Sequence, residues 1–152
     1  MDKKELKVVA ALCNGTVIDH IPSDKLFKVV SILKLDEVQN QLTFGNNLES
    51  GKLGTKGIVK VANLYFAQDV IDKIALIAPN AKLNIIKDYK VTEKKSVHLS
   101  DEITDIVCCA NPLCITNNQP VPTKFHVIDK NPITLRCHYC EKVFRENELR
   151  IK

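Results

Sequence analysis

The chain has 152 residues, of which 45% are hydrophobic and 26% are charged, with few glycines and prolines. This composition excludes an intrinsically disordered chain, because enough apolar surface is available to offset the entropy of ordering one domain or two small ones. No apolar segment resembles a signal peptide or is long enough to cross a bilayer, so we expect a cytoplasmic protein that does not enter membranes.

The net charge of +4 is unevenly distributed along the chain. Residues 1–100 hold 15 lysines against 11 acidic residues, whereas residues 101–152 hold 7 basic and 7 acidic residues. Five of the six cysteines also lie in the second part. In a reducing compartment such cysteines indicate metal ligation rather than disulfides. We therefore predict two domains, residues 1–100 and 101–152.

In the first domain, strands and helices alternate. The hydrophobic pattern predicts extended segments over 6–12, 16–21, 41–44, 57–62 and 82–91, and amphipathic helices over 24–35 and 68–78. Ser23 is the expected N-cap of the first helix, and Pro79 should stop the second. The order βαββαβ is that of the ferredoxin-like fold, an α+β architecture with a four-stranded antiparallel sheet and both helices on one face.

Six lysines lie on or beside the last two predicted strands of this domain. They are Lys56, Lys60, Lys87, Lys90, Lys94 and Lys95. One interpretation is a solvated sheet face, in which Lys60 extends its ammonium group to water. The other is a pocket for a phosphorylated or otherwise anionic ligand. No glycine-rich phosphate loop is present, which argues against an NTPase.

Catalytic residues are not predicted in the first domain. Asp19 and His20 could begin a catalytic dyad, but the dyad would need a nucleophile, and Ser23 is better explained as a helix cap. Asp19 and His20 are then interpreted as hydrogen-bonded polar residues at the end of a strand. Cys13 is most simply a small buried residue.

The second domain carries two cysteine knuckles. Cys109 and Cys114 form a Cys-x4-Cys pair, Cys137 and Cys140 form a Cys-x2-Cys pair, and 22 residues separate the two. Zn²⁺ favours four thiolates in a tetrahedron, and four sulfur ligands leave no position for a reactive water. The spacing therefore predicts one structural Zn²⁺, which would also stabilise a domain of few large apolar side chains.

Other ligands are possible at this site. Cys108 could replace Cys109, giving the less usual spacing Cys-x5-Cys, and His126 or His138 could replace a thiolate. The four-cysteine set is the preferred one. Strands packed around the metal are expected to contain Val107, Phe125, Val127, Ile128, Ile133, Leu135, Val143 and Phe144. The predicted domain is a small all-β zinc-ribbon or rubredoxin-like fold.

Several segments carry a resemblance to a known family. They are Asn14-Gly15-Thr16-Val17-Ile18-Asp19-His20-Ile21-Pro22, residues 47–56, Ala78-Pro79-Asn80-Ala81, and Cys137-His138-Tyr139-Cys140-Glu141-Lys142 together with the Cys-x4-Cys knuckle. With these, the chain resembles the regulatory chain of aspartate carbamoyltransferase, an enzyme of pyrimidine biosynthesis. The resemblance implies a non-catalytic regulatory subunit, whose first domain binds ATP as activator and CTP, assisted by UTP, as inhibitor. It also implies a zinc domain that docks on a separate catalytic chain, and regulatory dimers that bridge catalytic trimers.

The resemblance also implies a set of nucleotide-binding residues. They are Ala11, Leu12, Val17, Asp19, His20, Lys60, Asn84, Ile86, Tyr89, Val91 and Lys94. By the family's pattern, Lys94 suits the triphosphate and Lys60 the ribose or a base carbonyl. Asp19 can accept hydrogen bonds from ribose hydroxyls, and His20 can contact phosphate.

The residues implied for docking on the catalytic chain are Asn111, Glu141 and Lys142. This chain departs from the family's pattern at two places. Cys13-Asn14 stands where a basic pair is common, and Leu113 stands where an Asn is familiar.

Two other classes of function compete with regulation. A zinc ribbon can bind nucleic acid, but such a ribbon should be basic, and residues 101–152 have a net charge of zero. A zinc enzyme needs an open coordination position, which four thiolates do not leave. We therefore expect neither nucleic acid binding nor catalysis.

Overall fold

A computed structural model of the chain describes residues 11–51 and 54–152. The chain divides into two units, Met1–His98 and Leu99–Lys152. The extended segment expected over 6–12 lies mostly outside the described residues, and Ala11 and Leu12 belong to no strand. Within the described ranges, the helices are too short or too polar to span a membrane.

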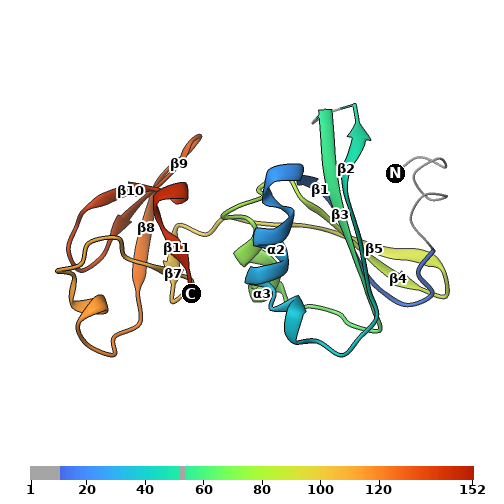
Figure 1. Cartoon of the computed structure of the whole chain (residues 1–152), viewed down its shortest axis with the longest axis horizontal. Helices are drawn as coiled ribbons and strands as arrows, with labels where there is room; N and C mark the ends of the chain where they lie inside the picture. Colours follow the sequence, from blue (N-terminus) through green and yellow to red (C-terminus); the bar gives the residue numbers. More distant parts are fainter. Residues whose placement is uncertain (1–10, 52–53) are drawn as a thin grey trace. The chain divides into compact units, whose positions relative to one another are not determined.

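In its described residues, the first unit has a five-stranded sheet and two α-helices (Figure 1). In chain order its elements are β1 Gly15–Pro22, the 3-10 turn η1 Ser23–Lys25, α2 Leu26–Ile32, η2 Leu35–Glu37, β2 Leu42–Ser50, β3 Gly54–Ala62, α3 Gln68–Ile74, β4 Lys82–Lys87 and β5 Lys90–Ser96. The sheet is antiparallel throughout, in the order β2-β3-β1-β4-β5. The first four strands in sequence have the ferredoxin-like order, which confirms the α+β prediction.

The fifth strand corrects the expected four-stranded sheet. The segment predicted as one strand over 82–91 is a hairpin of β4 and β5, which turns at Asp88 and Tyr89. Both turn residues have positive φ, 51° and 64°, as in a tight type I′ turn. The second central residue of such a turn is usually Gly, whereas Tyr89 stands there, so the sequence did not reveal the turn.

Both predicted helices are shorter than expected, and the expected N-cap is wrong. Ser23 lies inside η1, and its hydroxyl donates to the Thr55 hydroxyl at 2.9 Å instead of capping a helix. The second helix ends at Ile74 and continues as turns before Pro79.

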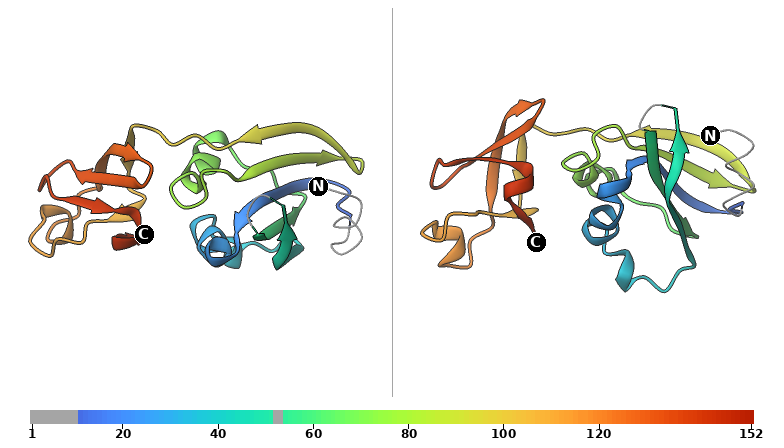
Figure 2. Two further views of the ribbon diagram at one scale, coloured as in Figure 1. Left: turned by 90° about the horizontal axis from the view of Figure 1, so that it is seen from above. Right: turned by 45° about the horizontal axis from the view of Figure 1, so that its top comes forward.

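The hydrophobic core of the first unit lies between the sheet and the helices. Figures 1 and 2 show α2 and α3 side by side against the sheet. Gly57 in β3 marks the contact, because a Cβ there would lie 3.0 Å from the Leu26 Cδ1 of α2. Since side chains alternate along a strand, Val59 and Val61 share this helix face, whereas Ile58 and Lys60 point to the opposite face. We call that opposite face the open face.

The second unit is all-β, as predicted. Its elements are β6 Glu102–Thr104, β7 Val107–Cys108, η3 Ile115–Asn117, β8 Lys124–Lys130, β9 Ile133–Cys137, β10 Val143–Arg145, η4 Glu146–Glu148 and β11 Arg150–Ile151. One sheet has the order β10-β9-β8-β6, and β11 pairs with β7 in a second. Phe125 and Leu135 are fully buried at its centre. Ile128 and Val143 lie in strands as expected, but they are 49% and 52% exposed and so do not pack around the cysteines.

Candidate functional site

Four cysteines of the second unit form one cluster. The Sγ atoms of Cys109, Cys114, Cys137 and Cys140 all lie within 4.8 Å of one another. The pairs Cys109–Cys140 and Cys114–Cys137 have Sγ–Sγ distances of 3.7 Å. Cys108 is not in the cluster, and its Sγ accepts a long hydrogen bond from Arg150 at 3.9 Å.

Backbone turns place the thiols by hydrogen bonds. The Asn117 amide donates to the carbonyls of Cys109 and Asn111, at 2.9 and 2.7 Å. The Leu113 N–H donates to the Asn111 side chain at 3.1 Å, which closes the first knuckle. In the second knuckle, the Glu141 N–H donates to the Cys137 carbonyl at 3.0 Å, and Glu141 takes the left-handed conformation with a φ of 62°.

The distances fit a tetrahedral metal ion. A metal–sulfur bond of about 2.3 Å, as for zinc, gives a tetrahedron with edges of about 3.8 Å. The observed 3.7 Å for both pairs is close to that edge. The geometry therefore suits one metal ion with four sulfur ligands.

The pKa values of three of these thiols are shifted, and not all in the same direction. Burial raises the pKa of Cys109 and of Cys137. Burial acts in the same direction on Cys140, but hydrogen bonds from the Lys142 N–H, the Asn111 amide and neighbouring thiols outweigh it and lower the pKa to about 7. A bound cation would displace the remaining protons, because thiolates are the metal ligands.

The two histidines considered as alternative ligands lie outside the sulfur cluster. His126 Nε2 and His138 Nδ1 are 2.9 Å apart and share a hydrogen bond. On its other side, His126 Nδ1 lies 3.7 Å from a Glu102 carboxylate oxygen. The two imidazole rings therefore have partners other than the cysteines.

A pocket of about 610 Å³ lies on the open face of the first unit. Ligand pockets typically have volumes of this order. Its lining includes all eleven residues that the family resemblance implies for a nucleotide, namely Ala11, Leu12, Val17, Asp19, His20, Lys60, Asn84, Ile86, Tyr89, Val91 and Lys94. Lys82, Lys95 and Ser96 line it as well.

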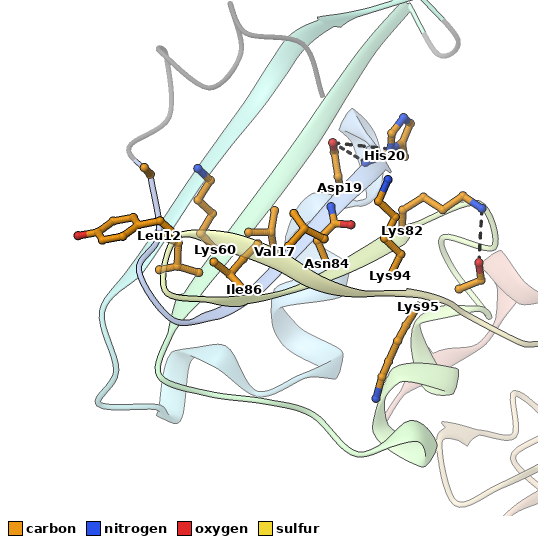
Figure 3. Close-up of a pocket in the computed structure, with 14 residues that line it drawn as sticks. Leu12, Val17, Asp19, His20, Lys60, Lys82, Asn84, Ile86, Lys94 and Lys95 are labelled. Carbon is orange, nitrogen blue, oxygen red and sulfur yellow. Dashed lines mark hydrogen bonds and ion pairs between the residues drawn. The ribbon is translucent and has the colours of Figure 1, made fainter.

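Strand register explains why these residues meet. Lys60, Val17, Asn84 and Lys94 lie opposite one another on β3, β1, β4 and β5, in a single row across the sheet. A second row on the same face holds Asp19, Lys82 and Ser96. Figure 3 shows Leu12 and Lys60 toward one end of the pocket and Asp19, His20 and Lys82 toward the other.

A buried ion pair supports the second end. Lys56 Nζ lies 3.0 and 3.3 Å from the two Asp19 carboxylate oxygens, and both side chains are at most 4% exposed. The Asp19 carboxylate also accepts the His20 N–H at 2.7 Å. His20 has a φ of 59° within an irregularity of the β1–β3 pairing. This bulge turns the imidazole into the pocket lining.

Lys60 is an unusual lysine, because only 3% of it is exposed. Burial lowers the pKa of its ammonium group below the ordinary value of 10.5, although the negative charge of Asp19 opposes the shift. A buried cation facing a pocket is a strong attractor for an anionic or carbonyl ligand group.

Residues 11–14 are hydrogen-bonded to the β4–β5 turn, and Ala11, Leu12 and Tyr89 of these two segments line the pocket. The Tyr89 N–H donates to the Cys13 carbonyl at 2.9 Å, and the Asp88 N–H donates to the Asn14 side chain at 3.2 Å. Cys13 is half-buried rather than buried as expected. Gly15 follows directly with a φ of 142°.

The six lysines noted in the sequence do not act as one group. Lys60, Lys94 and Lys95 line the pocket, although Figure 3 shows Lys95 pointing away from the others. Lys56 is not among the lining residues and forms the ion pair with Asp19. Lys87 stacks over the Tyr65 ring at 5.7 Å, and Lys90 is exposed in β5 outside the lining.

Sequence reasoning missed Lys82 and Ser96 because β5 was not foreseen. Ser96 belongs to that strand, and Lys82 was not recognised as a member of the row between β1 and β5. Alternation along a correctly placed hairpin would have found both, since Lys82, Asn84 and Ile86 are at every second position of β4.

The residues implied for docking differ in exposure. Glu141 and Lys142 are exposed, and Leu113 beside them in the other knuckle is 87% exposed. Asn111 is only 9% exposed, and its side chain accepts the Leu113 N–H. The Asn111 side chain therefore stabilises the turn of the first knuckle.

Comparison with known proteins accounts for both units. Residues 7–98 match the family model of the aspartate carbamoyltransferase regulatory chain, allosteric domain, and residues 101–150 match that of its metal binding domain. The chain is 59% identical over 141 residues to the aspartate carbamoyltransferase regulatory chain of Phocaeicola vulgatus, covering 93% of this chain and 91% of the relative. It is 55% identical over 150 residues to that of Parabacteroides distasonis, covering 99% and 97%. It is 50% identical over 147 residues to that of Pyrococcus abyssi, covering 95% and 96%. The chain therefore belongs to the family of aspartate carbamoyltransferase regulatory chains, which are regulatory and not catalytic subunits.

Proposed function

We propose that the open-face pocket binds the nucleotide effectors ATP, CTP and UTP, and that this binding regulates pyrimidine biosynthesis through the catalytic chain. The observation that carries the proposal is that one pocket gathers all eleven residues implied for a nucleotide. Their chemistry divides along the pocket in the way that a nucleotide requires.

One end of the pocket suits a base. Val17, Ile58 and Ile86 form a small buried cluster with Leu12 against it, so a flat ring would find apolar contacts there. Tyr89 and Val91 are 69% and 50% exposed at the rim, where a ligand could cover them. Burial of such exposed apolar side chains favours binding.

The other end suits phosphate. Lys94 can supply a cationic hydrogen-bond donor and His20 a ring N–H, and Lys56 neutralises the Asp19 carboxylate. Without that neutralisation a buried carboxylate would repel the ligand. Lys60 on β3 would donate a hydrogen bond to a ribose hydroxyl or to a base carbonyl oxygen.

For the cysteine cluster we propose one structural Zn²⁺. The four thiolates would hold it in a closed tetrahedron, and the ion would supply folding free energy to the second unit and no reactive water. This unit would present Glu141 and Lys142, with Asn111 shaping the knuckle, to the catalytic chain. We further propose that the chain forms a regulatory dimer and acts in the cytoplasm, where its thiols stay reduced.

Regulation would follow from differential binding. A nucleotide shifts the activity of the partner only if it binds one quaternary state more tightly than the other. The usual coupling of about 1–3 kcal/mol corresponds to a roughly five- to 150-fold change in binding affinity.

The test is calorimetry of the purified chain with ATP and CTP, followed by activity assays of the complex with the catalytic chain. We expect both nucleotides to bind, and Lys60→Ala and Lys94→Ala each to weaken binding, with Lys87→Ala as the matched control outside the pocket. If neither nucleotide binds, the assignment of the pocket as a nucleotide site is wrong. If neither nucleotide changes the activity of the complex, the proposed regulatory function is wrong.

A further inference from the structure

Two histidines of the second unit form a pair outside the cysteine cluster. His126 Nε2 and His138 Nδ1 lie 2.9 Å apart, and the two rings are tilted by 45° to each other. His138 is exposed and the His126 side chain is 26% exposed, so a small ion in solution can reach the two nitrogen atoms. Imidazole nitrogens are the commonest protein ligands of metal ions.

The strand register holds this pair in place. His126 of β8 is the register partner of Arg136 on β9, and His138 follows Arg136 by two residues, so the two histidines are diagonal neighbours. The His138 N–H donates to the Lys124 carbonyl at 2.8 Å, which extends the β8–β9 ladder by one residue. Side chains alternate along this ladder, so the buried Cys137 points to the other face. The histidine pair is therefore separate from the four sulfur atoms.

A carboxylate orients the His126 ring. Glu102 of β6 is the register partner of His126, and its Oε1 lies 3.7 Å from His126 Nδ1. A carboxylate only accepts hydrogen bonds, so it favours the tautomer with the proton on Nδ1 and leaves the lone pair of Nε2 directed to His138. Carboxylates take this position behind many metal-bound histidines.

The same face also carries two cations. Lys124 Nζ lies 3.6 Å from the second Glu102 carboxylate oxygen, which offsets its charge. Arg136 is exposed, so salt in the solvent screens its charge. The repulsion of a metal ion at the histidine pair is weakened accordingly.

The spacing of the two nitrogens is that of a chelate. Two metal–nitrogen bonds of about 2.1 Å at a right angle hold their nitrogens about 3.0 Å apart, whereas a tetrahedral angle needs about 3.4 Å. The observed 2.9 Å matches the right angle, which is typical of Ni²⁺ and Cu²⁺ with nitrogen and oxygen ligands. The terminal torsion of a histidine has broad minima, so a rotation of each ring can turn both lone pairs to one point.

We infer that His126 and His138 form a second metal site, which takes a divalent ion of the nickel or copper type with water as its remaining ligands. The ion replaces the proton that the two nitrogens share, and His138 then carries its proton on Nε2. Because His138 stands between Cys137 and Cys140 in the second knuckle, the ion links β8 to that knuckle through side chains as well as through the backbone.

The experiment is calorimetry of the full chain, with zinc on the cysteine cluster, against nickel chloride at about pH 8, where free imidazole is neutral. We expect one equivalent of nickel to bind. His126→Gln and His138→Gln should each lower the affinity by roughly a hundredfold, and Glu102→Gln by about tenfold. Nickel should also raise the midpoint of thermal unfolding of the parent chain and not of the histidine variants, since the pair exists only in the folded state. His98→Gln, which changes an exposed histidine of the first unit, is the matched control and should bind nickel as the parent chain does.

Zinc content, measured by elemental analysis after the titration, separates the histidine pair from the cysteine cluster. Nickel uptake with the zinc retained assigns the nickel to the histidines. Release of one zinc for each nickel bound would place the nickel on the thiolates and overturn the inference. Parent affinity in either histidine variant, or no binding by the parent chain, would overturn it as well. His126→Gln is the more informative variant, because position 126 lies on β8, away from the cysteines in sequence, and the variant should keep its zinc.

Discussion

The buried pair of Asp19 and Lys56 should dominate the stability of the first unit. Asp19→Asn keeps an oxygen that can accept the His20 N–H, but it removes the negative charge between Lys56 and Lys60. At 3.0 Å, the lost attraction to Lys56 corresponds to roughly 5 kcal/mol at an effective dielectric constant of about 20. Breaking one side of a buried pair typically costs about 3–5 kcal/mol, because the other charge stays buried. Such a loss is a large share of the roughly 5–15 kcal/mol that stabilises a protein of ordinary size.

Urea denaturation followed by far-UV circular dichroism measures this loss, since the chain has no Trp for fluorescence. Asp36→Asn, an exposed acid of the same unit, is the control and should change the free energy of unfolding by less than about 0.5 kcal/mol. The double variant Asp19→Asn/Lys56→Met should be less destabilised than the sum of the single variants, because it removes both charges. A loss below about 1 kcal/mol for Asp19→Asn would refute the account of a strongly coupled buried pair.

Three further outcomes are expected. Removing the metal with a chelator should unfold Leu99–Lys152, because a core this small rarely supplies enough stability by itself and structural zinc sites contribute about 10–16 kcal/mol of folding free energy. Amide hydrogen exchange would measure the loss of protection, and unfolding of both units together would mean that they fold as one. Cys109→Ser should lose the bound metal in elemental analysis while Cys108→Ser keeps it, and the reverse result would exchange their roles. Lys60 has a pKa below 10.5 in the folded chain, so the folded state binds fewer protons than the unfolded state in the interval below that value, and its contribution to the free energy of unfolding should rise with pH there. Denaturation at several alkaline pH values should show a shallower rise in Lys60→Met, and identical slopes would contradict the buried position of this charge.

The cysteine cluster was the part of the molecule that the sequence predicted best. Cysteine spacing alone distinguished Cys109 from Cys108, and the four Sγ atoms that it selected lie within 4.8 Å. Local spacing suffices here because each knuckle is a short turn with few ways to present two thiols. Helix and strand order was also predictable, because alternation of apolar residues reports which face of an element is buried.

Features that depend on distant partners could not be predicted in the same way. Nothing in the local sequence shows that Lys56 is buried against Asp19, which lies 37 residues earlier. The β4–β5 turn was missed because its left-handed residues are Asp88 and Tyr89, neither of which is glycine. The sequence also did not reveal that the Asn111 side chain accepts the Leu113 N–H; its expected place at the docking surface stays a prediction.

Gly15 is not among the residues that line the pocket, but it fixes the position of β1, which carries several of them. A Cβ at this position would lie 2.0 Å from the Val61 carbonyl oxygen, closer than any real contact. Any other amino acid would push β1 away from β3 at the point where the chain enters the sheet. Val17 and Asp19 follow on β1, so their distances to Lys60 and Lys82 would all change together. A mutational scan for lost regulation should therefore find position 15 intolerant of every substitution, although its backbone only sets the spacing between two strands.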